Sequence, residues 1–121
     1  MNKYFADTYA YIEVLKDNPS YHRFKKSVFL TSQYTVAELA YFFIRQDQEP
    51  TAIQVASRIS DDVINASLPT LLRAMKLKFL YRQKKLSYAD CIGYALAQDL
   101  GVKFLTGDKQ FKDLPDVEFL R

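Results

Sequence analysis

Short continuous apolar runs along the chain alternate with longer segments in which apolar residues recur every three or four positions. Continuous runs are typical of strands buried on both faces, and the longer spacing is typical of amphipathic helices. The predicted strands are 3–6, 27–31, 63–66, 102–105 and 117–120. The predicted helices are 8–16, 87–100 and three segments that begin near Thr35, Pro50 and Pro69. This alternation predicts a three-layer α/β/α sandwich around a central parallel sheet of four to five strands.

The clearest predicted helix runs from Ser87 to Leu100, because its apolar residues share one face and Gly101 lies where a left-handed cap is favoured. The strand at 102–105 follows after a very short loop, so the carboxyl end of this helix lies at the bottom of the sheet. The start of the helix therefore lies at the opposite edge, where the carboxyl ends of the parallel strands meet.

The composition is that of a folded domain. At 121 residues, we expect residues 1–121 to form a single domain, and 49% hydrophobic with 26% charged residues argue against disorder. No stretch approaches the roughly 18 apolar residues of a membrane span, and Lys3 and Asp7 interrupt the region where a signal peptide needs its apolar run. Because Cys91 is the only cysteine, no internal disulfide can form, and we expect a reducing, cytoplasmic location.

Four acids occupy equivalent places at the ends of these elements. Asp7 ends the first strand, and Asp108 follows the strand at 102–105 after two residues. Glu38 lies in the first turn of the helix predicted from Thr35, and Asp90 lies near the start of the helix from Ser87. All four are therefore expected at the carboxyl edge of the sheet, where ligands bind in open α/β folds.

Helix capping and turn chemistry offer a structural alternative for three of these acids. Thr35 with Glu38, and Ser87 with Asp90, both fit the capping box, in which the acid bonds back to the amide of the cap residue. The Gly-Asp pair that ends in Asp108 is ordinary turn chemistry. Asp7 has no comparable structural explanation, because it follows a strand that should be buried.

Four acids at one edge would repel one another. Two carboxylates about 4 Å apart repel by about 4 kcal/mol at an effective dielectric constant of about 20, so such a group either takes up protons or binds a cation. Sites built from oxygen alone suit Mg²⁺ or Mn²⁺, whereas zinc prefers His and Cys. The chemistry that fits such a site best is hydrolysis of a phosphodiester.

The segments around the acids resemble the motifs of the PIN domain family in order and spacing. These segments are Phe5-Ala6-Asp7-Thr8, Thr35-Val36-Ala37-Glu38-Leu39, Leu86-Ser87-Tyr88-Ala89-Asp90-Cys91-Ile92 and Phe104-Leu105-Thr106-Gly107-Asp108-Lys109-Gln110-Phe111. The last two are the most specific. The resemblance covers nearly the whole chain, and a stand-alone chain of this size is similar to VapC-type toxins.

The resemblance implies a Mg²⁺-dependent endoribonuclease, with Mn²⁺ able to substitute, that cleaves RNA and is held inactive by a cognate antitoxin. The family's catalytic and metal-binding quartet carries over to Asp7, Glu38, Asp90 and Asp108. Thr8 and Thr106 are expected to support the site. We expect Asp7 and Asp90 to be the principal metal ligands. Glu38 and Asp108 are expected to bind the metal or to orient metal-bound water.

Two positions depart from the family pattern. Tyr9 stands where a small polar residue is common, and Gln110 stands where a further acid or Asn is common. Tyr9 could narrow the pocket, and Gln110 could weaken a second metal position. We therefore expect one firmly held ion, with a second recruited by the substrate.

The sequence also admits functions other than that of a nuclease. A PIN-like fold can also act as a catalytically weak RNA-binding or scaffold module, and a formal net charge of +3 does not separate the two. Cys91 and His22, the only thiol and the only imidazole, lie too far apart in sequence to suggest a Cys-His nucleophile. Several basic residues could guide an RNA backbone or simply be solvated. They are Lys25, Lys26, Arg73, Lys76, Arg82, Lys84 and Lys85.

The predicted helix at 35–45 is apolar nearly all round. Val36, Phe43 and Ile44 are joined by the neighbouring aromatic residues Tyr41 and Phe42. One face of such a helix would pack inward and another against a partner. The sequence therefore predicts a homodimer.

Overall fold

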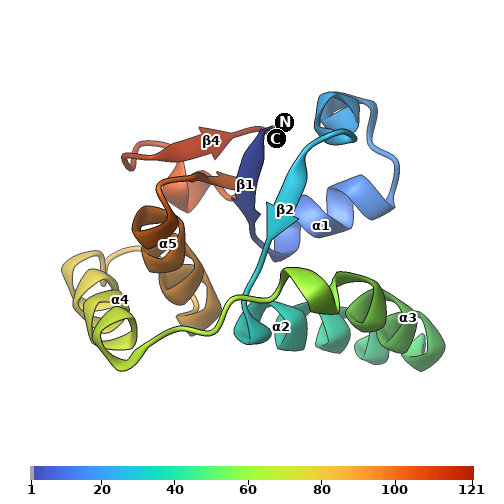
Figure 1. The fold of residues 1–121 in the computed structure, drawn as a ribbon, viewed down its shortest axis with the longest axis horizontal. Coiled ribbons are helices and arrows are strands. Elements are labelled where there is room, and N and C mark those ends of the chain that lie inside the picture. The colour runs from blue at the N-terminus through green and yellow to red at the C-terminus, as the bar shows by residue number, and fades with distance from the viewer. Residues whose placement is uncertain (1) are drawn as a thin grey trace.

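Four parallel strands form the centre of the structure, a computed structural model that describes residues 2–121 (Figure 1). The strands are β1 (Lys3–Ala6), β2 (Val28–Leu30), β3 (Lys103–Thr106) and β4 (Val117–Phe119), in the order β2-β1-β3-β4. The helices are α1 (Thr8–Leu15), α2 (Gln33–Arg45), α3 (Glu49–Ile59), α4 (Leu68–Leu80) and α5 (Tyr88–Leu100). Short 3-10 helices are η1 (Pro19–Phe24), η2 (Ser60–Asp62) and η3 (Lys109–Phe111).

The predicted three-layer arrangement is confirmed, and the sheet has four strands, the lower of the two predicted numbers. The prediction of a strand at 63–66 is wrong, because this segment forms only a single bridge between Val63 and Thr31. β2 ends at Leu30 and Ser32 already caps α2, so Thr31 alone is left to pair with this segment. No helix within residues 2–121 is long and apolar enough to cross a membrane.

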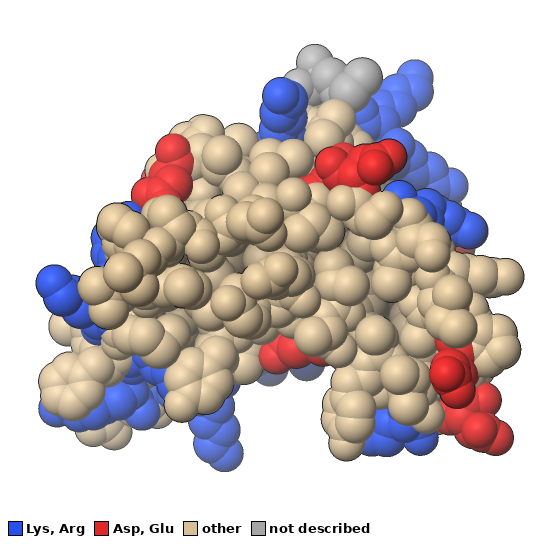
Figure 2. Space-filling view, turned by 60° about the horizontal axis from the view of Figure 1, so that its bottom comes forward, with Lys and Arg blue, Asp and Glu red and all other residues tan. Residues whose placement is uncertain are grey.

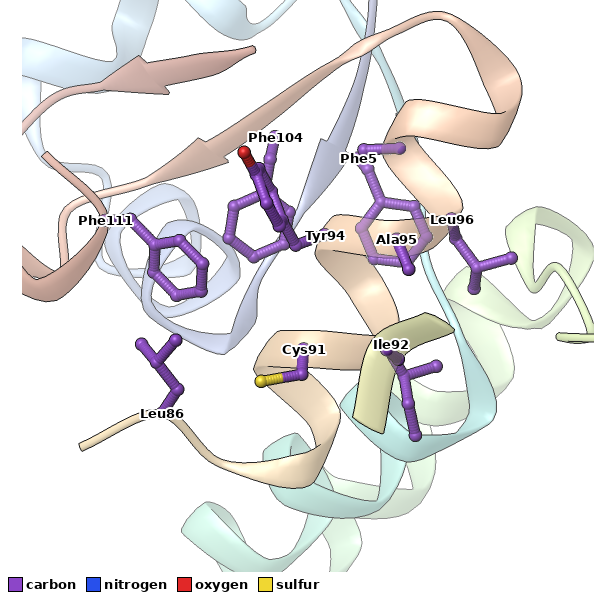
Figure 3. Close-up of a cluster of buried hydrophobic side chains, with 11 residues drawn as sticks. Phe5, Leu86, Cys91, Ile92, Tyr94, Ala95, Leu96, Phe104 and Phe111 are labelled. Carbon is purple, nitrogen blue, oxygen red and sulfur yellow. The ribbon is translucent and has the colours of Figure 1, made fainter. Parts of the chain in front are cut away.

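Alternate residues of the central strands supply the two halves of the core. Phe5 and Phe104 extend from neighbouring strands towards α5, with their ring centroids 6.2 Å apart, and Phe111 joins them (Figure 3). Ala6 and Leu105, the next residues along the strands, pack into the second cluster with α1, η1 and α2. This period of two is what a parallel sheet covered on both faces requires.

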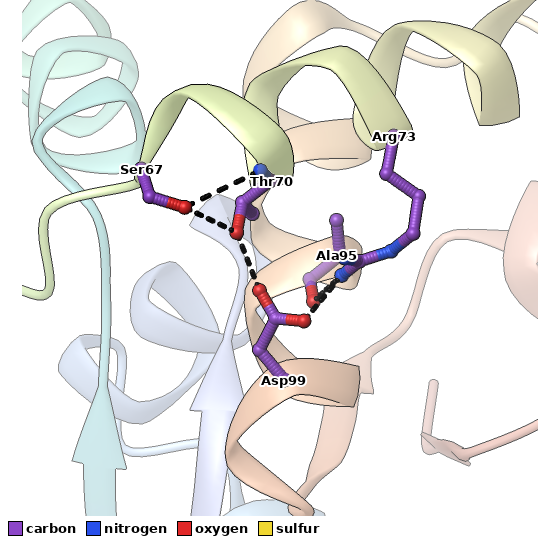
Figure 4. Close-up of polar contacts among 5 residues, drawn as sticks. All are labelled: Ser67, Thr70, Arg73, Ala95 and Asp99. Atoms are coloured by element: carbon purple, nitrogen blue, oxygen red, sulfur yellow. Dashed lines mark hydrogen bonds and ion pairs between the residues drawn. The ribbon is translucent and has the colours of Figure 1, made fainter.

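A polar network fixes α4 along α5 (Figure 4). The carboxylate of Asp99 accepts hydrogen bonds from the Thr70 hydroxyl at 2.5 Å and from Arg73 at 2.7 Å. The Arg73 guanidinium also donates to the carbonyl of Ala95 at 2.7 Å. Because Thr70 lies near the start of α4 and Asp99 near the end of α5, the helices run antiparallel. The end of α4 therefore lies beside the start of α5.

Candidate active site

Asp7 ends β1 and begins α1. One of its oxygens accepts the amide of Ala10 at 2.9 Å, and the other accepts the Thr106 hydroxyl. Asp7 is thus the N-cap of α1, so the expectation that it has no structural role is wrong. Its side chain is 4% exposed. Burial raises its pKa to about 8, against the lowering effect of the two hydrogen bonds, and the charges of Asp90 and Asp108 raise it further.

Glu38 lies in the second turn of α2, because the helix begins two residues earlier than predicted. The buried Ser32 is the N-cap, and its hydroxyl accepts the amide of Thr35 at 3.2 Å. The capping box predicted for Thr35 and Glu38 is therefore wrong. The Glu38 carboxylate instead accepts the hydroxyl of Thr8 at 2.9 Å, which ties α2 to the residue after Asp7.

Asp90 forms the predicted capping box at the start of α5. Its carboxylate accepts the amide of Ser87 at 3.0 Å, and its own amide donates to the Ser87 hydroxyl at 3.0 Å. Burial raises the pKa of Asp90 to about 6, and its hydrogen bonds with Ser87 oppose this. The negative charges of Glu38 and Asp108 add to the increase.

Asp108 follows β3 and caps η3. Its carboxylate accepts the amide of Gln110 at 2.9 Å, and its amide donates to the Thr106 hydroxyl at 2.9 Å. The Thr106 hydroxyl thus accepts from the backbone of Asp108 and donates to the side chain of Asp7. Both the turn chemistry and the place at the sheet edge that the sequence predicts for Asp108 are found.

The four acids gather at one edge, although their elements are far apart in sequence. The charges that raise the pKa of Asp7 and Asp90 come from within this group. Figure 2 shows acidic side chains in a recess between two projecting lobes, with the lobe that contains α4 on the left and the α2–α3 lobe on the right. The edge therefore forms one acidic site.

The donor atoms of this site match a hard divalent cation. Four carboxylates and the hydroxyls of Thr8 and Thr106 offer only oxygen, the ligand type of Mg²⁺ and Mn²⁺. In the described part of the chain, no three Asp, Glu, His or Cys side chains lie close enough together to form a ready-made metal cluster. The case for a cation therefore rests on the repulsion between the acids, which a cation would relieve, and on their oxygen donors. It does not rest on a preformed coordination shell.

Tyr9 packs against the segment that carries Asp108. A Cβ added to Gly107 would lie 2.1 Å from Cε1 of Tyr9 and 2.6 Å from the carbonyl oxygen of Leu120. The guanidinium of Arg121 lies 5.8 Å from the centre of the Tyr9 ring and donates to the carbonyl of Gly107 at 3.1 Å. The aromatic residue at position 9 thus packs against a position that has room for glycine alone.

We expect Gly107→Ala to lower the free energy of unfolding by about 1–3 kcal/mol, because the added methyl group meets both a ring and a backbone carbonyl. Urea unfolding would measure the loss. Tyr9→Ser removes the clash with the ring but not the one with Leu120, so the double variant should recover only part of the lost stability. Wild-type stability in Gly107→Ala would contradict this packing.

Two basic residues differ from the sequence-based expectations. The sequence left open whether Arg73 contacts an RNA backbone or is simply solvated, and in the structure it pairs with Asp99. Lys78, which was not singled out, donates to the carbonyl of Leu86 at 2.5 Å and lies beside the start of α5. The sequence around Lys78 does not indicate that this residue lies beside α5, because that proximity depends on the antiparallel packing of α4 against α5.

The sequence matches the family model of the PIN domain over residues 4–117. No curated protein matches the sequence. The match includes all four acids and both supporting threonines.

Solved structures of similar fold cover nearly the whole chain. The chain is similar to Mycobacterium tuberculosis VapC20, described as a toxin that cleaves the sarcin-ricin loop, with a TM-score of 0.78, 18% identity and coverage of 94% of this chain and 96% of that chain. It is also similar to a toxin-antitoxin complex from Klebsiella pneumoniae, with a TM-score of 0.72, 21% identity and 95% of each chain covered. A third is VapBC2 from Rickettsia felis bound to a DNA fragment from its promoter, with a TM-score of 0.71, 16% identity and coverage of 98% and 97%. These likenesses establish the fold.

Proposed function

Because the chain belongs to the PIN domain family, we propose that it is a metal-dependent endoribonuclease and the toxin of a VapBC-type toxin-antitoxin pair. The observation that carries the proposal is the group of four acids at one edge, in which burial and mutual repulsion raise the pKa of Asp7 and Asp90. The similar structures include a toxin named for RNA-loop cleavage and two toxin-antitoxin complexes, which supports the same reading.

The proposed site divides its work among the acids. Asp7 and Asp90 would be the principal ligands of Mg²⁺ or Mn²⁺, and Glu38 and Asp108 would complete the site and orient water. Bound there, the cation would supply an activated water and offset the negative charge that develops on the phosphate. Because the pKa of Asp7 is about 8, this carboxyl would lose its proton when the cation binds near neutral pH.

The supporting residues hold these acids in place. Thr106 donates to the side chain of Asp7, Thr8 donates to that of Glu38, and Ser87 fixes Asp90 through the capping box. The carboxylate of Asp108 accepts the amide of Gln110. Each of the four acids therefore has a partner that limits its rotamers before RNA binds. Such preorganisation is what a site for charge stabilisation requires.

An RNA cleavage assay tests the proposal. Purified protein should cut a labelled RNA in Mg²⁺ or Mn²⁺ and should not cut it in excess EDTA. Cleavage that persists in the chelator would overturn the metal-dependent mechanism. The alternative, a catalytically weak RNA-binding or scaffold module, predicts RNA binding without cleavage and no tight ion site in calorimetry with Mn²⁺.

A groove between α1 and α2 supports the proposal of an antitoxin partner. It has a volume of about 210 Å³ and is lined mainly by the apolar and aliphatic parts of Ile12, Leu15, Lys16, Phe42, Phe43, Gln46 and Gln48.

We place the protein in the cytoplasm, where its RNA target and its antitoxin would both be present.

We propose a homodimer in which the α2–α3 pair contributes contact surface. Tyr41 and Ile44 on α2, and Ile53 on α3, are large apolar residues exposed to solvent. Burying them against a second copy would remove apolar area from water. Light scattering at micromolar concentration should give the mass of a dimer, and Ile44→Asp should shift the protein towards the monomer. A monomeric wild-type mass would contradict the proposal.

A further inference from the structure

A hollow at the end of α4 combines exposed rings with unpaired positive charge. It has a volume of about 360 Å³. Its lining consists of Met75, Lys78, Phe79, Arg82, Lys84 and Tyr88, and we call it the α4 hollow. None of the four acids of the candidate active site lines it, so the hollow needs an account of its own.

Two aromatic side chains stand open to solvent in the α4 hollow. Phe79 is 69% exposed and Tyr88 is 64% exposed. Each ring already has a cation over its face: the Arg82 guanidinium lies 4.5 Å from the Phe79 centroid, and the Lys78 ammonium lies 4.8 Å from that of Tyr88. An exposed ring beside a cation is the surface on which single-stranded bases stack.

The positive charge of the α4 hollow has no carboxylate partner in the described part of the chain. Lys78 and Arg82 donate only to backbone carbonyls, those of Leu86 and Phe79, and Lys84 forms no ion pair there. Arg73, on the same helix, shows the contrast, because Asp99 neutralises it. Unneutralised cations of this kind favour a polyanion.

The α4 hollow lies next to the acidic site. Tyr88 is the first residue of α5 and precedes Asp90 by two positions. Lys78 is anchored to Leu86, just before the Ser87 cap, so its charge is held at the same helix start. In Figure 2, Lys and Arg side chains lie on the lobe that contains α4, beside the recess that holds the acids. An RNA strand that enters the recess would therefore pass this lobe.

We propose that the α4 hollow is a binding subsite for single-stranded RNA next to the scissile phosphate. Bases stack on Phe79 and Tyr88, while Arg82 and Lys84 contact the backbone phosphates. The choice of RNA as the ligand rests on the proposed nuclease function. Charge complementarity favours RNA over an apolar protein segment, because a cation lies over each of the two rings. The subsite also offsets the repulsion between an acidic site and its polyanionic substrate.

Equilibrium binding in EDTA tests this subsite without any cleavage. The probe is a fluorescein-labelled oligouridylate of about 8 nucleotides, and its anisotropy is followed as the full chain is titrated. Phe79→Ala and Tyr88→Ala should each weaken binding by about tenfold. Arg82→Gln should weaken it less and lower the slope of log K against log salt by about 0.7.

Matched variants control for general surface effects. Leu68→Ala removes an equally exposed apolar side chain from the opposite end of α4, and Lys103→Gln removes a charge from the exposed start of β3. Neither should change affinity or mass. Equal RNA affinity in wild type, Phe79→Ala and Arg82→Gln would overturn the subsite, as would a loss of RNA binding that follows a change of oligomeric state. Absence of wild-type binding would also overturn it, and the separate cleavage assay decides whether the nuclease function falls with it.

Discussion

Replacing Asp90 with asparagine is expected to reduce metal-dependent RNA cleavage by at least about 100-fold while the fold remains intact. The amide oxygen of asparagine can still accept the amide of Ser87, so the start of α5 keeps its cap. What the substitution removes is one negative charge from the group formed with Glu38 and Asp108. A loss of activity would therefore report the chemistry of the site rather than the stability of the helix.

Asp99→Asn on the same helix is the matched control. Asp99 lies near the other end of α5, where it binds Thr70 and Arg73, so its substitution should leave cleavage within about twofold of wild type. Cleavage would be followed with a labelled RNA in Mn²⁺, and folding by circular dichroism. Asp7→Asn should behave like Asp90→Asn. Undiminished cleavage in either site variant would refute the assigned role of the quartet.

Without divalent cations, the stability of the protein is expected to fall as the pH rises from about 4 to about 8. The pKa of Asp7 is 3.8 in its ordinary state and about 8 in the fold, so between these values the folded protein holds a proton that the unfolded chain does not. Stability therefore decreases with pH across this window, by several kcal/mol in order of magnitude. Asp90, with a pKa of about 6, adds to the decrease at the lower end.

Added Mn²⁺ should reverse this loss near pH 8, because a ligand that binds only the folded protein stabilises it. Thermal unfolding at several pH values, with Mn²⁺ and with EDTA, measures both effects. In Asp7→Asn the pH dependence should be much flatter and the gain from Mn²⁺ much smaller. A wild-type melting temperature that is independent of pH in EDTA would contradict the buried, protonated state of Asp7. A temperature that is unchanged by Mn²⁺ would contradict the metal site.

The layers of the fold could be predicted because each strand is nearly continuous in apolar residues. Phe5 and Ala6, on opposite faces of β1, are both buried, which is why the pattern is continuous and still informative. The segment 63–66 shows where this reasoning ends. It is apolar enough for a strand, but Thr31 is its only pairing partner, because β2 ends at Leu30 and Ser32 caps α2. The apolar pattern of a segment does not show how much of a neighbouring strand is available to pair with it.

The candidate site was predictable as a set of acids, but not in the role of each one. Ser32 and Thr35 are three positions apart, and either residue type is favoured as an N-cap. Which of them begins the helix depends on where β2 ends. Because the helix starts at Ser32, Glu38 is free to bind Thr8. Asp7 shows the opposite case. It was expected to have no structural role outside the site, but it also caps α1.

Three of the four acids begin helices, and this affects how any mutational survey of the protein has to be read. Alanine at position 7, 90 or 108 would remove a charge and a cap together, so the resulting variant would combine lost chemistry with a frayed helix terminus. Glu38 caps nothing, and its alanine variant would give the cleaner record of charge alone. Substitutions at these three positions are constrained both by the chemistry of the site and by the helix cap. Even in a copy of this domain without activity, the cap alone would favour aspartate or asparagine at these positions.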